Sequence, residues 1–273
     1  MRFRNAITLS CTAGILAVAS VLPVSAGTFA QFIQQGGGNG FSLTAPSSPG
    51  PPPTGQLLST TALPIVFQYK GSPDGPIASA PLNVDIFGTL TFTTSSVGGA
   101  IPSGTQAIEA FAPVSFSFTA TGQTIGTFVI PAGANLLTGT TTFFSPPPPP
   151  PAVNGFNALS GTLGASSASF SGSDVNINMF GNPTAPIAQR VNYSSTYINF
   201  NTAFNKAFAY SFSSVQPIYG ISGPPPGGFI NPFTAAGSGT FSAVVPEPGA
   251  IAMLASLGVT GSLLVGRRLR RRR

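Results

Sequence analysis

Side chains that could carry out chemistry are scarce in this sequence. Its 273 residues include no histidine, and the single cysteine, Cys11, lies within an apolar segment near the first residue. Serine–histidine–aspartate and cysteine–histidine catalytic arrangements therefore cannot be assembled. The carboxylates between residues 27 and 245 are also few: Asp74, Asp85, Glu109 and Asp174.

A pair of these carboxylates is the one catalytic arrangement that the composition leaves open. Glycoside hydrolysis uses two carboxyl groups about 5 to 9.5 Å apart. No local motif selects one pair of the four over another. The sequence therefore predicts a protein that is not an enzyme, and a glycoside hydrolase remains the third hypothesis for its function.

Oxygen ligands for a metal ion would come from Asp174, Asn176 and Asn178, which share one face if this segment is a strand. Such ligands suit Ca²⁺, but a single carboxylate brings little charge. Polar residues at alternate positions are typical of the solvent side of a strand. We therefore predict no metal site and no cofactor.

Aromatic side chains could instead contact a sugar. The sequence has 23 Phe, 5 Tyr and no Trp, and Phe belongs mostly to protein cores. Tyr193 and Tyr197 stand apart because their neighbours are polar, namely Asn192, Ser194, Ser195, Thr196 and Asn199. This pair is the candidate sugar contact, and a carbohydrate-binding module for an exopolysaccharide is the alternative function.

Strands must position these residues, because the apolar side chains recur with period two. Val114, Phe116 and Phe118 alternate with small hydroxyl residues, and similar runs surround Leu90, Val175 and Phe208. Further candidate strands cover 63–69, 82–87, 124–130, 138–144, 156–164, 190–200 and 237–245. About ten strands predict an all-β fold, an antiparallel β-sandwich or jelly-roll-like domain.

The composition agrees with an exported, turn-rich β protein. Charged residues make up only 6% of the chain, while 33 Gly and 28 Pro supply turns. The pI near 10.1 comes from basic residues close to the two ends, and residues 27–245 carry a net charge near −1. Because that segment has no basic face, we predict no nucleic-acid partner.

The first residues have the order of a secretory signal peptide. Arg2 and Arg4 precede an apolar stretch, and Val24-Ser25-Ala26 offers small residues for cleavage after Ala26. This predicts export by the Sec machinery, with a retained anchor as the alternative. The expected organisation is a signal peptide over 1–26, a strand and Gly/Pro-rich loop over 27–60, and a β-sandwich body over 61–245.

The last residues combine three features in order. Pro246-Glu247-Pro248 is followed by an uncharged segment, 249–266, whose eighteen residues as a helix span about 27 Å, enough to cross a bilayer core. Positive residues then favour a cytoplasmic end; they are Arg267, Arg268, Arg270, Arg271, Arg272 and Arg273. The alternative is an ordinary tail anchor.

This three-part segment, 246–273, resembles the PEP-CTERM sorting signal of Gram-negative bacteria. The resemblance covers only the C-terminal residues 245–273. It implies that an exosortase, a membrane-embedded enzyme, recognises Pro246-Glu247-Pro248 after transient insertion of the chain in the cytoplasmic membrane. The expected destination is the outer surface or an extracellular matrix rich in exopolysaccharide, where a non-enzymatic structural or adhesive role is the first hypothesis.

Overall fold

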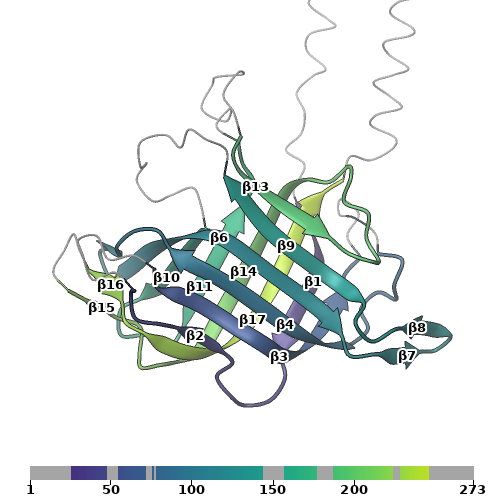
Figure 1. Cartoon of the computed structure of the whole chain (residues 1–273), viewed down its shortest axis with the longest axis horizontal. Helices are drawn as coiled ribbons and strands as arrows, with labels where there is room; N and C mark the ends of the chain where they lie inside the picture. Colours follow the sequence, from purple (N-terminus) through teal and green to yellow (C-terminus); the bar gives the residue numbers. More distant parts are fainter. Residues whose placement is uncertain are drawn as a thin grey trace, which may run out of the picture.

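The secondary structure of the protein consists of β-strands wherever the computed structural model describes it (Figure 1). The described residues are 26–47, 55–71, 76, 78–143, 157–176, 187–223 and 228–245. The strands are β1 (Gly27–Gln34), β2 (Phe41–Leu43), β3 (Leu57–Tyr69), β4 (Ile86–Ser96), β5 (Ile101–Ser103), β6 (Gln106–Ala120), β7 (Gln123–Ile125), β8 (Phe128–Ile130), β9 (Asn135–Phe143), β10 (Asn157–Thr162), β11 (Ala168–Ser173), β12 (Val175–Asn176), β13 (Ile187–Ser194), β14 (Phe204–Gln216), β15 (Ile221–Ser222), β16 (Phe229–Ile230) and β17 (Phe233–Val244).

The two ends of the chain lie outside this description. Residues 1–25 of the predicted signal peptide and the whole sorting segment, 246–273, are not among the described residues. Across the described ranges, no helix has the length and apolar character needed to span a membrane.

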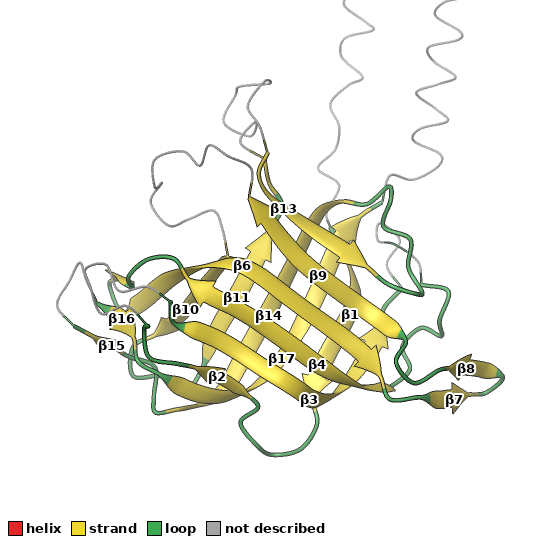
Figure 2. Cartoon of the chain, in the orientation of Figure 1, coloured by secondary structure: helices red, strands yellow, loops and turns green. Residues whose placement is uncertain are grey.

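Two layers of strands face each other and cross (Figures 1 and 2). The front layer contains β13, β9, β6, β4 and β3, and the back layer contains β11, β14, β17 and β1. Hydrogen bonding joins the layers into one circuit, β1–β3–β4–β6–β10–β11–β14–β17, in which β17 returns to β1. Every pairing between these strands is antiparallel, and the two facing layers make the arrangement sandwich-like.

Strand β6 pairs with different strands along its two halves. Its first half pairs with β10, through Glu109 opposite Leu159, whereas its second half lies between β4 and β9. The register on the β4 side shifts between Thr94 and Ser96, near the point where the partners of β6 change. One long strand thus carries the chain around a corner of the sandwich.

The core between the layers is aromatic. Tyr210 of β14 is fully buried and packs against rings from both layers, with its ring centroid 5.0 Å from Phe92 and 5.3 Å from Phe32. Phe116 and Phe118 point inward from β6, as the alternation of this segment predicts. Burial of each such ring stabilises the fold by roughly 1.5 to 3 kcal/mol.

Inward-facing glycines make room for these rings. A Cβ atom built on Gly139 would lie 2.0 Å from the Phe116 ring, and one built on Gly237 would lie 2.4 Å from the ring of Phe41. Glycine in these strands therefore serves the packing of phenylalanine rather than the formation of turns.

The predicted all-β class is confirmed, but several element boundaries differ. The expected strand over 82–87 is mostly a loop, because β4 begins only at Ile86. The segment 124–130 forms two short strands, β7 and β8, joined by a turn with Gly126 at a φ of 61°. The segment 190–200 stops being a strand after Ser194 and continues as a loop. Short strands raise the total above the ten expected.

Candidate functional site

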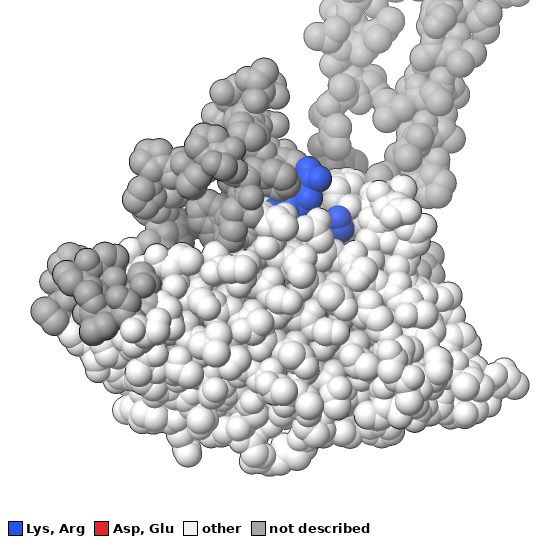
Figure 3. Space-filling view, in the orientation of Figure 1, with Lys and Arg blue, Asp and Glu red and all other residues white. Residues whose placement is uncertain are grey.

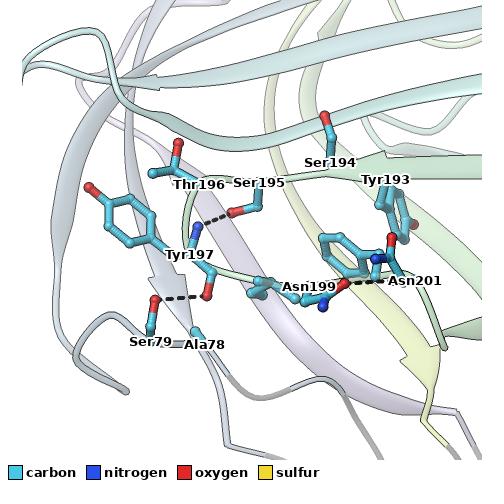
Figure 4. Close-up of a pocket in the computed structure, with 11 residues that line it drawn as sticks. Ala78, Ser79, Tyr193, Ser194, Ser195, Thr196, Tyr197, Asn199 and Asn201 are labelled. Carbon is cyan, nitrogen blue, oxygen red and sulfur yellow. Dashed lines mark hydrogen bonds between the residues drawn. The ribbon is translucent and has the colours of Figure 1, made fainter.

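A polar cavity lies along the loop between β13 and β14, residues 195–203. Its volume is about 700 Å³, and the end of β13 and residues 78 and 79 complete its wall (Figure 4). A cavity of this size falls in the range of small-molecule sites. Ser79, Thr196, Asn199 and Asn201 present exposed side chains along it.

Alternation of apolar and polar residues fixes this loop against the body. Ile198 and Phe200 are buried, while Asn199 and Asn201 between and beyond them face solvent. The backbone N–H of Ser79 donates to the carbonyl of Tyr197 at 2.8 Å, so a segment far away in the sequence supports the loop. The cavity wall is therefore held in place before any ligand arrives.

Further hydrogen bonds hold the start of the loop. The Ser195 hydroxyl donates to the Leu136 carbonyl at 2.7 Å and accepts from the backbone N–H of Tyr197 at 3.0 Å. The Asn199 side chain accepts from the backbone N–H of Asn201 at 3.0 Å (Figure 4). These contacts order the backbone but leave the side-chain amides of Asn199 and Asn201 with N–H donors for a ligand.

The described wall of the cavity carries hydroxyl and amide groups and no charged residue. Neutral hydrogen-bonding groups do not concentrate ions, and they match ligands that offer many neutral donors and acceptors. A sugar is such a ligand. The chemistry of the lining therefore suits a neutral carbohydrate better than a nucleotide or a metal ion.

Tyr193 does not form the exposed face that the sugar-contact hypothesis requires. Its side chain is only 8% exposed, and its hydroxyl donates to the Ala207 carbonyl at 2.6 Å. Its ring lies edge-on to Phe29, with the centroids 5.5 Å apart. The expectation of a stacking platform at Tyr193 is corrected: the ring is part of the core, because Tyr193 shares the inward phase of β13 with Val191.

Tyr197 is also mostly buried, at 9% exposed. Its ring packs against Tyr69 and Phe128, with centroid distances of 6.1 and 6.0 Å. Figure 4 shows Tyr193 and Tyr197 on opposite sides of the view rather than side by side. The two rings therefore do not form one flat surface for a sugar, and the polar groups between them line the cavity instead.

Glu109 does not lie close to either of the other described carboxylates, Asp85 and Asp174, as the hydrolase hypothesis would require of a catalytic pair. Glu109 lies eleven positions before Ala120 on β6. Ala120 pairs with Gly88 of β4, and Asp85 precedes Gly88 in the direction that leads further from Glu109. At about 3.3 Å per residue, the strand from Glu109 to Ala120 alone spans about 36 Å. This separation is far above the range used by glycosidases.

Asp174 is also distant from Glu109. The register runs from Glu109 through Leu159 to Phe170, and Asp174 follows Phe170 by four residues. The distance along the strand alone is about 13 Å, again beyond the glycosidase range. Asp74 lies outside the described residues.

Asp174 is occupied by the backbone. One carboxylate oxygen accepts from the N–H of Val191 at 2.6 Å, and the other accepts from the N–H of Lys206 at 2.9 Å. Asp174 thus joins β13 to the start of β14. No group of three acidic, His or Cys side chains that could hold a metal occurs in the described part of the chain. The side chains of Asn176 and Asn178 are outside that part.

Glu109 is a buried acid, 0% exposed, in a polar cluster at the corner of the sandwich. Its carboxylate accepts the backbone N–H of Ile230 at 3.0 Å, while the Gln56 side chain donates to the Ile230 carbonyl at 2.7 Å. Burial raises the pKa of Glu109 to about 7, although the Ile230 N–H and the Ser96 hydroxyl oppose this rise. Burial, and to a smaller extent the nearby Glu109, also raises the pKa of Tyr219.

The sequence indicated the polar segment that lines the cavity, but the expectation of exposed tyrosine rings there is wrong. Ser194, Ser195, Thr196 and Asn199 were predicted polar neighbours and do lie at the cavity. The phase of β13, with Asn192 and Ser194 outward, already indicated that the tyrosine between them points inward. The contribution of Ser79 had no signal in the sequence, because its contact with Tyr197 spans 118 positions.

No protein-family model, no curated protein and no solved structure matches this chain.

Proposed function

We propose that this chain is an exported, exosortase-sorted protein of the cell surface or extracellular matrix of a Gram-negative bacterium, with a non-enzymatic structural or adhesive role. The observation that carries the proposal is the order of Pro246-Glu247-Pro248, the uncharged segment 249–266 and the arginines from Arg267 onward. The predicted signal peptide over 1–26 agrees with it. The Sec machinery and an exosortase are the partners that this order implies.

The body supports such a role in two ways. Its antiparallel layers enclose a large aromatic core without any cysteine in residues 27–245, so the fold does not depend on disulfides. The buried acid Glu109 lies far from both Asp85 and Asp174, which favours a scaffold over a hydrolase. We infer that the body is a single two-layer β-sandwich. We also propose that the order of its strands is jelly-roll-like.

The sorting proposal predicts that replacing Pro246, Glu247 and Pro248 together with alanine blocks release of the protein. Each proline fixes its own φ and disfavours helix at the residue before it, so we expect Glu247 to be presented in an extended segment at the membrane boundary. With three alanines, we expect the predicted helix over 249–266 to extend upstream, so that the recognition site is lost. Uncut protein should then accumulate in the cytoplasmic membrane, and the released fraction should fall at least tenfold.

Mass measurement of the released wild-type protein is the decisive control. The proposal expects a C-terminus without the arginine segment, whereas a released chain that still carries Arg273 would refute cleavage. Pro131, an exposed proline of the body, provides the matched control, because its change to alanine should leave processing of the tail intact.

A carbohydrate-binding module is the second candidate function, and the cavity beside residues 195–203 favours it. The cavity is neutral, polar and held by backbone hydrogen bonds. Its binding groups would be Ser79, Thr196, Asn199 and Asn201, with Tyr197 contributing an edge of its ring.

This candidate predicts that Asn199→Ala combined with Asn201→Ala weakens binding of cellotriose or maltotriose at least tenfold, because each lost hydrogen bond removes about 1 kcal/mol. Calorimetric titration of the full chain measures the effect. Asn39→Ala, which changes an amide elsewhere on the surface, is the control. Failure of both trisaccharides to bind the wild-type protein would remove the module hypothesis for this cavity.

A further inference from the structure

The outer face of the front layer is made of small polar side chains, mostly hydroxyls, in register across several strands. One row, Ser59, Thr93, Ser115, Thr140 and Asn192, crosses β3, β4, β6, β9 and β13. The neighbouring row contains Thr91, Ser117, Thr138 and Ser194. We call these two rows the hydroxyl face.

The hydroxyl face is open to solvent and uncharged. Thr91, Thr93, Ser115, Asn192 and Ser194 are exposed, and the rest of the face is partly exposed. Figure 3 shows no charged side chain over this part of the described surface, and basic atoms appear only at its upper margin. Arg190, opposite Thr142 on β13, marks that margin.

The geometry of the sheet spaces these hydroxyls regularly. Neighbouring strands lie about 4.8 Å apart, and residues on one face of a strand repeat about every 6.8 Å. Threonine is restricted in χ1, so its hydroxyl is already oriented and loses little freedom on binding. Five strands therefore present a grid about 20 Å wide, which is long enough to contact several units of a polymer.

Several of these groups are available for a ligand. The hydroxyls of Thr91, Thr93 and Thr140 make no hydrogen bond within the described residues. Ser117 is bonded only weakly, with its oxygen 3.4 Å from that of Thr138, whereas the Thr138 hydroxyl donates to the Asn135 side chain at 2.9 Å. A ligand could therefore take the place of water at the central rows without breaking the sheet.

The chemistry of the hydroxyl face excludes most kinds of partner. Protein interfaces are enriched in aromatic residues and Met at their centres, but the rings of Phe92, Phe116 and Phe118 beneath this face point inward. Nucleic acids and anionic membranes require clustered Lys and Arg, which the rows lack. A neutral polymer with many hydroxyl groups matches the face in both charge and hydrogen bonding.

We propose that the hydroxyl face is a docking surface for a neutral polysaccharide, which lies across β4, β6, β9 and β13. The proposal rests on the extracellular location proposed above and adds the surface and the class of partner. Ser194 belongs to the second row and to the wall of the cavity, so the face leads directly to that site. The many weak contacts along a polymer then add up to retention.

The test compares two triple variants of the full chain, purified in a polyoxyethylene detergent that contains no sugar. Thr91→Val, Thr93→Val and Thr140→Val remove three hydroxyls of the face but keep β-branched side chains of the same shape. Thr28→Val, Thr162→Val and Thr240→Val make the same change at exposed positions outside the face. Binding is measured by depletion on cellulose, cross-linked dextran and cross-linked galactomannan in about 1 M NaCl, which screens the arginine segment.

The proposal expects the wild-type protein to bind at least one of these polysaccharides. The face variant should lose affinity tenfold or more, because three hydroxyl groups that bind the polymer are removed, and the control variant should bind as wild type. Circular dichroism of both variants shows that the fold is retained.

Three outcomes overturn the proposal: no binding by the wild-type protein to any of the three, equal loss in both variants, or unchanged binding by the face variant. A concentration-dependent dimer that only the face variant abolishes would assign the face to a second copy of the chain. These results do not depend on tail processing, so a failure of the sorting proposal, seen by mass, is distinguishable from a failure here.

Discussion

Replacing Tyr193 with alanine should destabilise the protein by about 4 kcal/mol, the usual cost of deleting a large buried ring. The ring packs against Phe29 and Phe200, with centroids 5.5 and 5.4 Å away, and its hydroxyl is the donor to the Ala207 carbonyl. Both the packing and the hydrogen bond would be lost. Urea unfolding followed by tyrosine fluorescence measures the change in the free energy of unfolding.

Two conservative variants separate the contributions. Tyr193→Phe removes only the hydrogen bond and should cost about 1 kcal/mol. Tyr210→Phe removes a buried hydroxyl that has no hydrogen-bond partner among the described residues, so it should leave stability unchanged or raise it by about 1 kcal/mol. A Tyr193→Ala protein that unfolds at the wild-type urea concentration would show that the ring is on the surface, as the sugar-contact hypothesis assumed.

Raising the pH from about 4.5 to about 8 should destabilise the wild-type protein by about 3 kcal/mol through Glu109 alone. Its pKa in the folded protein is about 7, against an ordinary value of 4.5. Between these values the unfolded chain releases the proton and the folded chain keeps it. The contribution of Glu109 to stability is therefore fully present below pH 4.5 and is lost as the pH rises through 7. The difference of about 2.5 pKa units gives the magnitude.

Glu109→Gln is the test of this effect. The amide has nearly the same shape, can accept the Ile230 N–H through its oxygen, and does not ionise. The variant should therefore show a nearly flat stability across this pH range and should exceed the wild type at its upper end. The chain contains no histidine, the side chain that ordinarily titrates in this range, so histidine does not contribute to the measured pH dependence.

An unchanged slope in Glu109→Gln would assign the pH dependence to another group and would place Glu109 in contact with water. Asn39→Ala, which removes an exposed amide that does not ionise, provides the control. This variant should show the same slope over this pH range as the wild type.

The all-β class was predictable because the signal is local. An inward side chain and its outward neighbour alternate within a few residues, so Val114 to Phe118 and Phe208 to Phe212 identify strands without knowledge of their partners. The same phase rule, applied to Val191 and Tyr193, indicates a buried tyrosine. Composition alone also determined that residues 27–245 have no thiol or imidazole for catalysis.

Pairing between distant segments decided the rest. Glu109 meets the Ile230 N–H across 121 positions, and Ser79 meets the Tyr197 carbonyl across 118. Alternation shows that Thr93, Ser115 and Thr140 face outward, but only the register of β4, β6 and β9 places them in one row. Register depends on how the aromatic side chains and glycines of separate strands pack together, and a shift of one residue would turn each row to the other face.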